Sequence, residues 1–176
     1  MSLATLSSDG RFRYELRRRI DPPGSGGMVP WVMLNPSTAD AENDDPTIRK
    51  VVGFSRRWGA RSVRVYNLYA LRATDPDDLF AALARGEDCV GDGDQWLTRL
   101  GVYARTTGSP IVLGWGARPV PAARIARVLE LLEDAPLMSV GVTKSGAPCH
   151  PLMLPYSARL RRWTPPPVAQ TAASTA

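Results

Sequence analysis

The sequence predicts an α/β fold, a three-layer sandwich around a central, mostly parallel four-stranded sheet with a further edge strand near the N-terminus. Short apolar runs that end at polar or glycine residues alternate along the chain with segments whose apolar residues recur at helical spacing. Strands that alternate with helices require crossovers, which give a parallel sheet with helices on both faces. The chain has 176 residues, 44% of them apolar, so we expect one domain over residues 1–164.

The strands and helices are expected in a regular order. Segment 11–20 alternates weakly and predicts the edge strand. Asp45-Pro46 and Asp75-Pro76 are typical helix starts, because aspartate caps the first turn and proline suits the first helical position. Residues 165–176 are rich in Pro, Ala, Thr and Ser and are expected to form a disordered tail. The expected buried strands are 31–34, 63–66, 111–113 and 137–140, and the expected helices are 45–59, 75–83, 94–104 and 121–132.

The chain is basic, with a formal net charge of +5, and nearly all of its cations are arginines. A basic balance favours polyanionic partners and the planar arginine fork suits phosphate, but a coding bias toward arginine explains the composition equally well. Clustering along the chain is therefore the better guide. The clusters are Arg17, Arg18 and Arg19; Arg56, Arg57, Arg61 and Arg64; and Arg159, Arg161 and Arg162.

Composition disfavours several classes of protein. Cys89 and Cys149 form no C-x-x-C pair, so neither a structural zinc site nor a four-cysteine iron–sulfur cluster is expected, and no metal or cofactor is predicted. The chain has no run of about 18 apolar residues, so no membrane span is expected. Its polar start lacks the pattern of a signal peptide, which predicts a cytoplasmic protein with reduced thiols.

The most informative motif ends the first buried strand abruptly, at Leu34-Asn35-Pro36-Ser37-Thr38. The Asn35 amide offers one acceptor and two donors, enough to hold a water or a polar ligand edge. The hydroxyls of Ser37 and Thr38 can donate to an anion such as phosphate. Equally, this stretch is a turn whose polar side chains satisfy backbone groups.

An acidic loop that includes Asp40, Glu42 and Asp44 follows this motif. Paired carboxylates can serve general acid–base chemistry or bind magnesium. Helix capping by Asp45 explains part of the cluster without either. We favour capping, and keep Asp40 and Asp44 as secondary catalytic residues.

Two polar residues after later strands are expected at the same edge of the sheet as Asn35. Asn67 lies between Tyr66 and Tyr69, either as an amide that reads a base beside stacking aromatics or as ordinary strand-end packing. His150 is the only histidine, and a lone histidine is more often structural, but its loop of glycine and prolines is rigid enough for catalysis. Because ligands bind beyond the carboxyl ends of parallel strands, these groups can converge on one cleft.

The segment after the histidine combines an apolar tip with a basic end. Such a tip can wedge into a base stack while arginines grip phosphates. Alternatively, residues 156–163 are only an amphipathic final helix with a solvated basic face. The tip consists of Leu152, Met153 and Leu154, and the arginines are Arg159, Arg161 and Arg162.

Four of these stretches together resemble the uracil-DNA glycosylase superfamily, which shows a strand ending in G-x-[ND]-P, an asparagine at a later strand end, an L-L-W-G strand and an H-P-S loop. They occur in the family's order within residues 31–163, with Met33-Leu34 in place of the glycine and the residue after it, and Leu152 in place of the serine. The signatures N-P-S-T-A-D, D-D-P-T and H-P-L resemble more closely a bacterial and phage domain family of unknown function. The four stretches are Leu34–Ser37, Val65–Leu68, Val112–Gly116 and His150–Leu152.

The resemblance implies a DNA glycosylase that flips uracil or a damaged or modified base from single- or double-stranded DNA and hydrolyses its N-glycosidic bond. Asn35 takes the place of the water-positioning residue, and His150 that of the histidine facing the base carbonyl. Two other functions stay open: a base- or nucleotide-binding module without catalysis, and an N-glycosidase of small nucleosides. The implied base-binding residues are Leu34, Pro36, Tyr66, Asn67 and Tyr69, and the implied intercalating loop is Leu152 to Leu154.

Overall fold

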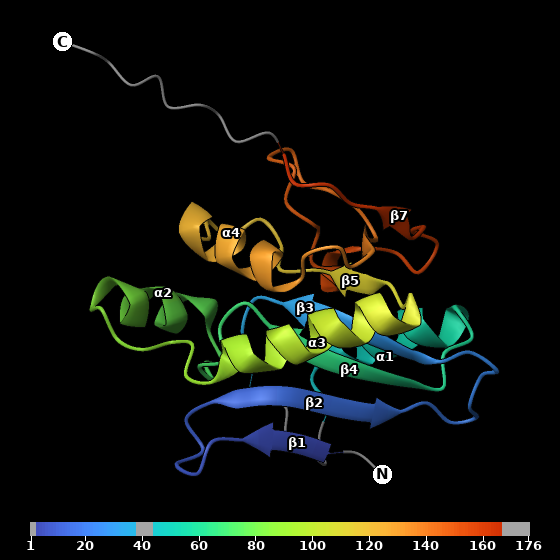
Figure 1. Ribbon diagram of the computed structural model, residues 1–176, viewed down its shortest axis with the longest axis horizontal. Coiled ribbons are helices and arrows are strands. Elements are labelled where there is room, and N and C mark those ends of the chain that lie inside the picture. The colour runs from blue at the N-terminus through green and yellow to red at the C-terminus, as the bar shows by residue number, and fades with distance from the viewer. Residues whose placement is uncertain (1–2, 38–43, 167–176) are drawn as a thin grey trace.

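The computed structural model describes residues 3–37 and 44–166, and a seven-stranded sheet lies at its centre (Figure 1). The strand order is β1-β2-β4-β3-β5-β6-β7. β3, β4, β5 and β6 pair in parallel, whereas β1–β2, β2–β4 and β6–β7 are antiparallel pairs. The strands are β1 (Leu3–Leu6), β2 (Arg13–Arg19), β3 (Met28–Met33), β4 (Ser62–Asn67), β5 (Ile111–Leu113), β6 (Leu137–Ser139) and β7 (Arg161–Arg162).

The four expected parallel strands are confirmed, but the sheet around them is larger than expected. The expected edge strand exists as β2, yet it is an inner strand, because β1 pairs with its free side. Residues 156–163 do not form the helix considered as an alternative, since Arg161 and Arg162 pair with β6. β1 and β7 have four and two residues, too few for an alternating pattern to predict a strand.

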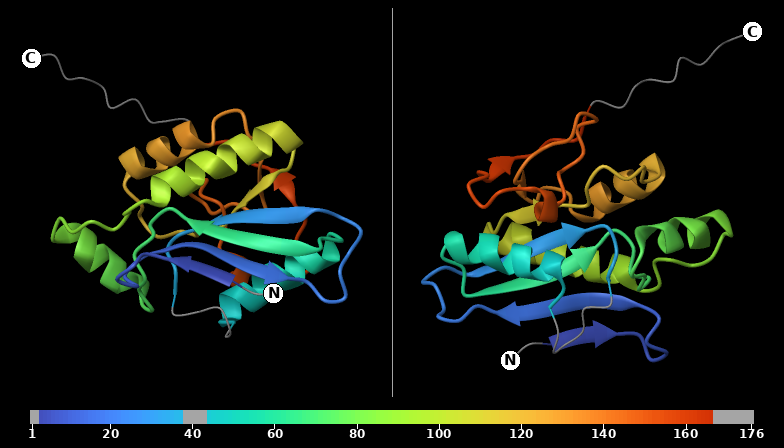
Figure 2. Two further views of the ribbon diagram at one scale, coloured as in Figure 1. Left: turned by 60° about the horizontal axis from the view of Figure 1, so that its bottom comes forward. Right: turned by 180° about the vertical axis from the view of Figure 1, so that it is seen from behind.

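Four helices of the described residues cover the two faces of the sheet and complete a three-layer sandwich (Figure 2). One face packs against α1, through a cluster that includes Trp31, Val65 and Phe54. The other face packs against α2, α3 and α4, through a cluster that includes Val32 and Leu100. The helices are α1 (Pro46–Arg57), α2 (Pro76–Ala84), α3 (Gly93–Thr107) and α4 (Ala122–Leu131).

The expected helix starts are confirmed by their caps. Asp45 Oδ1 accepts a hydrogen bond from the Ile48 amide at 2.7 Å, and Asp75 Oδ1 accepts one from the Asp77 amide at 2.9 Å. Each cap satisfies an amide that has no partner within its helix, and proline follows as the first helical residue. No described helix combines the length and the apolar character needed to cross a membrane.

The loops after the parallel strands are tied to one another at the carboxyl edge of the sheet. The Leu68 amide donates to the Met33 carbonyl at 2.8 Å, and the Gly114 amide donates to the Val32 carbonyl at 2.9 Å. The Gly116 amide donates to the Pro148 carbonyl at 2.9 Å, which fastens the histidine loop to the end of β5. These bonds join residues as far apart in the sequence as Val32 and Gly114, and together they hold the loops after β3, β4 and β5 and the histidine loop at this edge.

Candidate functional site

A pocket of about 430 Å³ lies beyond the carboxyl ends of β3, β4 and β5. Its walls come from the loops that follow these strands, from the start of α1 and from the loop that begins at His150. The structure thus brings together Asn35, Asn67 and His150, as the strand-end rule predicts. The other expected residues that line the pocket are Leu34, Ser37, Leu152 and Met153.

The Asn35 amide is held by the backbone on its nitrogen side. Nδ2 donates to the carbonyl oxygens of Pro36 and Ala73, each at 3.1 Å. An amide nitrogen has two hydrogens, so these bonds use both of them. The polar atom that Asn35 keeps for a ligand is its carbonyl oxygen, which is an acceptor only.

Asn67 follows the same pattern. With the amide turned so that its nitrogen faces acceptors, Nδ2 lies 3.3 Å from the backbone carbonyl oxygens of both Tyr66 and Asn35. The side chain is 6% exposed, so this orientation avoids burying two acceptors against each other. The expected reading of a base by both a donor and an acceptor of Asn67 is therefore reduced to one acceptor.

His150 complements these acceptors with a donor. The Leu152 amide donates to His150 Nδ1 at 3.4 Å, which leaves the proton of the neutral ring on Nε2. Burial lowers the pKa of His150, and the nearby Asp45 carboxylate offsets part of that shift. Gly116 leaves little room beside this residue, because an added Cβ there would lie 3.2 Å from His150 Cβ. A neutral imidazole of fixed tautomer and restricted position is the result.

Asp45, which was expected only to cap a helix, also lines the pocket. One carboxylate oxygen accepts from the Ile48 amide, and the other accepts from the Ser37 hydroxyl. Of the described residues around the pocket, Asp45 is the one carboxylate. Its position beside a strand-end asparagine and a histidine was not signalled by the sequence, because the cap accounted for it.

One of the two secondary catalytic residues from the acidic loop, Asp44, does not join Asp45 in the pocket. Asp44 pairs with Arg18 at 2.6 Å and does not line the pocket. Asp40 lies outside the described residues, and so does Thr38, which was expected to bind phosphate.

Two arginines of the pocket were also missed. Arg13 is 2% exposed and donates to the Ser37 carbonyl at 3.4 Å. Arg118 lies at the mouth, where it pairs with Asp77 at 2.7 Å. Arg13 begins β2 beside a register shift in the β1–β2 pairing, so simple strand alternation did not indicate which way it points. The pocket therefore carries cationic groups as well as neutral donors and acceptors.

Several expected site residues lie elsewhere. Tyr66 and Tyr69 belong to the core cluster on the α3 side of the sheet, and the Tyr66 hydroxyl donates to Glu15 rather than pointing to a base. Pro36 is buried beside the pocket without lining it, and Leu154 packs against the α1 side of the core. The exposed residues Arg159, Arg161 and Arg162 lie near or in β7. They do not line this pocket, nor do they line the arginine-rich hollow at the opposite end of the strands.

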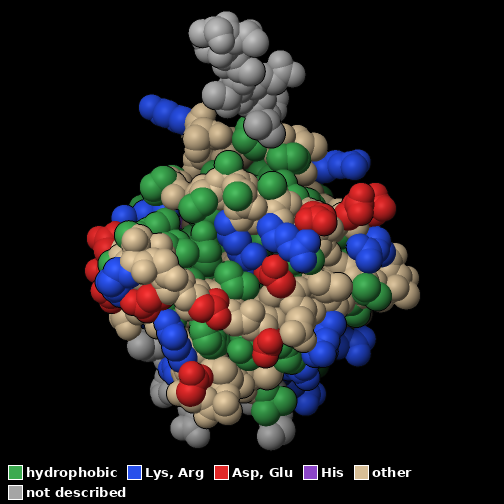
Figure 3. Space-filling model, turned by 60° about the vertical axis from the view of Figure 1, so that its left-hand side comes forward, with side chains coloured by type: hydrophobic (Ala, Val, Ile, Leu, Met, Phe, Trp, Pro, Cys, Tyr) green, Lys and Arg blue, Asp and Glu red, His purple; other side chains and the backbone are tan. Residues whose placement is uncertain are grey.

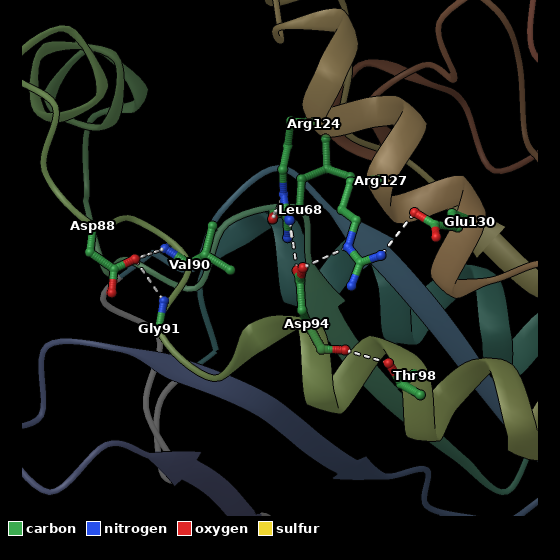
Figure 4. Close-up of polar contacts among 9 residues, drawn as sticks. All are labelled: Leu68, Asp88, Val90, Gly91, Asp94, Thr98, Arg124, Arg127 and Glu130. Atoms are coloured by element: carbon green, nitrogen blue, oxygen red, sulfur yellow. Dashed lines mark hydrogen bonds and ion pairs between the residues drawn. The ribbon is translucent and has the colours of Figure 1, made fainter.

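A polar network behind the pocket fixes the end of β4 (Figure 4). Arg124 of α4 donates through Nε to the Leu68 carbonyl at 2.7 Å, immediately after Asn67. Its Nη1 lies 2.6 Å from Asp94 Oδ1 at the start of α3, and Asp94 also contacts Arg127. The Arg124 guanidinium stands over the Tyr69 ring, 5.6 Å from its centroid. Tyr69 therefore helps to hold the strand end that carries Asn67.

Comparison with known proteins places the chain in a family without assigning a function. Within the described ranges, no group of three or more His, Cys, Asp or Glu side chains is arranged to hold a metal ion. No curated protein and no solved structure gave a significant match. The profile of one family matches residues 13–152, which contain all four stretches around the pocket. The chain belongs to the family described as "Protein of unknown function (DUF1643)".

Proposed function

We propose that the pocket binds a nucleobase, uracil or a damaged or modified base of DNA, and that the protein hydrolyses the N-glycosidic bond of that nucleotide. One observation carries the proposal: Asn35, Asn67, Asp45 and His150 line a single pocket although they come from distant segments. A volume of about 430 Å³ lies within the usual range for small-molecule sites. The resemblance of the four stretches to uracil-DNA glycosylases supports the same chemistry.

His150 is suited to stabilise the leaving base. When the bond between the sugar C1′ and the base nitrogen breaks, the electron pair leaves with the base and negative charge develops on a carbonyl oxygen. A neutral imidazole that presents Nε2–H stabilises this charge by donating a hydrogen bond, and it does not have to be protonated to the imidazolium first. Removing one such preorganised donor slows a reaction by roughly 10²–10³-fold.

Asn35 and Asp45 are suited to the water that completes the reaction. The free carbonyl oxygen of Asn35 can accept a hydrogen bond from that water, but an amide has no useful pKa and takes up no proton. Asp45 supplies the missing base, because its carboxylate lines the same pocket. The water oxygen bonds to C1′ and one of its protons passes to the carboxylate. That proton then passes from the carboxylic acid, through solvent, to the departed base anion, which restores the carboxylate.

The rim of the pocket suits a flipped nucleotide. Leu152 and Met153 are 43% and 80% exposed, although both are apolar. Apolar side chains at such a position can fill the gap left in a base stack, which offsets part of the few kcal/mol that flipping costs. Arg118, at the mouth of the pocket, adds positive charge where the phosphates that flank a flipped nucleotide would lie, and the buried Arg13 adds to the positive potential inside the pocket.

The test is base release from oligonucleotides. Single- and double-stranded oligonucleotides that carry a panel of uracil, damaged and modified bases are incubated with the protein, and alkali then cleaves any abasic sites. We expect cleavage with at least one base, and a loss of roughly 10²–10³-fold in both Asn35→Ala and His150→Ala, with DNA affinity nearly unchanged.

The same experiment separates the competing functions. Tight binding of one modified base without release by the wild type would contradict the glycosylase and indicate a binding module. Release from free nucleosides but not from any oligonucleotide would indicate a small-nucleoside N-glycosidase. Full activity in both Asn35→Ala and His150→Ala would contradict the proposed mechanism.

A further inference from the structure

A second hollow, of about 590 Å³, lies at the opposite end of the strands and is lined by five arginines. They are Arg17, Arg18, Arg19, Arg61 and Arg64. We call it the arginine groove. Its residues come from β1, the end of β2, the start of β4 and the loop before β3, whereas the pocket lies around Asn67 at the other end of β4. β4 runs from Ser62 in the groove to Asn67 in the pocket, and at about 3.3 Å per strand residue these two residues lie roughly 17 Å apart.

Strand pairing builds the groove from two of the arginine clusters seen in the sequence. β2 and β4 run antiparallel, with Arg17 opposite Arg64 and Arg19 opposite Ser62. Arg61 immediately precedes β4. Arg19 and Arg61 are more than 40 residues apart in the sequence, and strand pairing thereby joins the first cluster and part of the second into one basic surface.

A buried carboxylate organises part of this surface. Glu15 is 1% exposed, and its two oxygens contact the guanidinium groups of Arg17 and Arg64. Those arginines are themselves 41% and 38% exposed, so each is anchored on one side and open to solvent on the other. Arg61 is anchored likewise, because its Nε donates to the Gly26 carbonyl at 3.0 Å. Anchored guanidinium groups lose less rotamer freedom when they bind an anion.

The groove keeps a clear excess of positive charge. Among the residues that the structure describes, Glu15 pairs with Arg17 and Arg64, and Asp44 pairs with Arg18, so two described carboxylates face five guanidinium groups. The face of the molecule shown in Figure 3 differs, because basic and acidic side chains are interspersed there. A concentration of one sign in a hollow attracts ligands of the opposite sign.

We propose that the arginine groove binds the phosphate backbone of a nucleic-acid strand. Arg61 and Arg64 are three residues apart, so their backbone positions lie about 10 Å apart along the strand direction. Five arginines from two neighbouring strands offer more donors than one phosphate group can contact. Arginine forks pair with phosphate oxygens through two parallel hydrogen bonds, and such contacts bind without reading sequence. The groove thus takes a polyphosphate strand, whatever chemistry the distant pocket performs.

The test is the salt dependence of binding to a fluorescein-labelled single-stranded 20-mer, measured by fluorescence anisotropy. The variant Arg19→Ala/Arg61→Ala removes two groove charges. We expect its affinity to fall by about tenfold at low salt, and the slope of log K against log[salt] to flatten by about 1.4, or 0.7 per lost phosphate contact. Arg161→Ala/Arg162→Ala removes the same charge from exposed residues of β7, at the far edge of the sheet, and should bind like the wild type.

Three outcomes would contradict the proposal that the arginine groove binds a nucleic-acid strand. Equal losses in the two double variants would show that net charge alone attracts DNA, and a loss confined to the β7 variant would place binding at the other edge. Displacement of the 20-mer by inorganic phosphate at an equal concentration of phosphate groups would show a site for single anions. A thermal melt of each variant checks folding, and Arg19→Glu against Arg162→Glu repeats the comparison with one exposed residue each.

The proposal for the groove and the proposal for the pocket chemistry can be contradicted independently of each other. A protein that releases no base, yet binds the 20-mer through the groove, contradicts only the glycosylase proposal. A protein that releases base with the same affinity and salt slope in both double variants contradicts only the groove.

Discussion

The two ends of the central strands use opposite means to present polar groups. At the carboxyl ends, loops from distant segments place single atoms in a pocket, and hydrogen bonds to the backbone or to neighbouring side chains fix the two amides, the imidazole and the carboxylate. At the other end, two adjacent strands place several like charges in a hollow through their register. The first arrangement suits a reaction at one bond, and the second suits attraction to an extended chain of charges.

This difference determines how each end should respond to substitution. A pocket built from single oriented atoms loses its function when one atom is changed, because no neighbour replaces it. A groove built from several cations loses affinity in proportion to the charge removed.

The largest effect is expected for Asp45→Asn in the pocket. Asparagine is also a good helix cap, so the hydrogen bond from the Ile48 amide survives and the free energy of unfolding should change by less than about 1 kcal/mol. The proton acceptor is lost, and base release should fall by about 100-fold or more. Single-turnover rates of abasic-site formation measure the loss.

Asp44→Asn is the matched control for Asp45→Asn. It removes the same charge from the preceding residue, which pairs with Arg18 outside the pocket. We expect its base release to remain within about threefold of the wild type, since no pocket hydrogen bond involves it. Equal losses in the two variants would mean that the carboxylate of residue 45 has no particular role.

The parallel centre of the fold was predictable because its strands are short, buried apolar runs between helices with clear starts. The same strand-end argument correctly placed Asn35, Asn67 and His150 around one pocket. The pocket residues that this argument did not predict depend on tertiary contacts. Whether the capping residue Asp45 also faces a cavity is decided by a loop that lies next to it only in the folded chain.

The expected aromatic partners of Asn67 illustrate a different shortfall. Successive residues of a strand point to opposite faces, so Tyr66 and Asn67 of β4 cannot both face the same pocket. The alternation of side chains along this strand can be recognised in the sequence, but the prediction treated Tyr66 and Asn67 as a single base-binding motif. Tyr66 instead lies on the α3 side and donates to Glu15, and burial together with that hydrogen bond raises the pKa of the Tyr66 hydroxyl.

A smaller effect is expected for Glu15→Gln beneath the arginine groove. Glutamine can still accept from Tyr66, but it no longer pairs with Arg17 and Arg64, which are partly exposed. The free energy of unfolding should fall by about 2 kcal/mol, between the values for exposed and buried ion pairs. Urea unfolding measures it.

The same variant tests what the groove depends on. Glu15→Gln adds one positive charge to the protein and releases the two anchored arginines. We expect its affinity for the 20-mer not to rise, because the lost anchoring offsets the added charge. Glu133→Gln adds the same charge on an exposed residue after α4 and serves as the control. A clear rise in affinity for Glu15→Gln alone would show that charge matters and anchoring does not.

The smallest effect is expected from pH, and it should appear at only one end of the strands. Burial holds the pKa of His150 below its value in the unfolded chain, so between these two values the unfolded state binds more protons. The free energy of unfolding therefore decreases as the pH is lowered from about 6.5 through the pKa of the folded protein. Subtracting the values for His150→Gln, measured by urea unfolding from about pH 5 to about pH 8, isolates this contribution because the other groups cancel.

Asp45→Asn should extend this pH window. The Asp45 carboxylate partly offsets the effect of burial on the pKa of His150, so its removal should lower that pKa further and move the lower end of the window to more acid pH. The arginine groove contains no histidine, and its guanidinium groups stay charged throughout the range. Affinity for the 20-mer should therefore stay constant while the stability difference changes. A stability difference that is independent of pH, or that grows on acidification, would mean that His150 is not held neutral in the pocket.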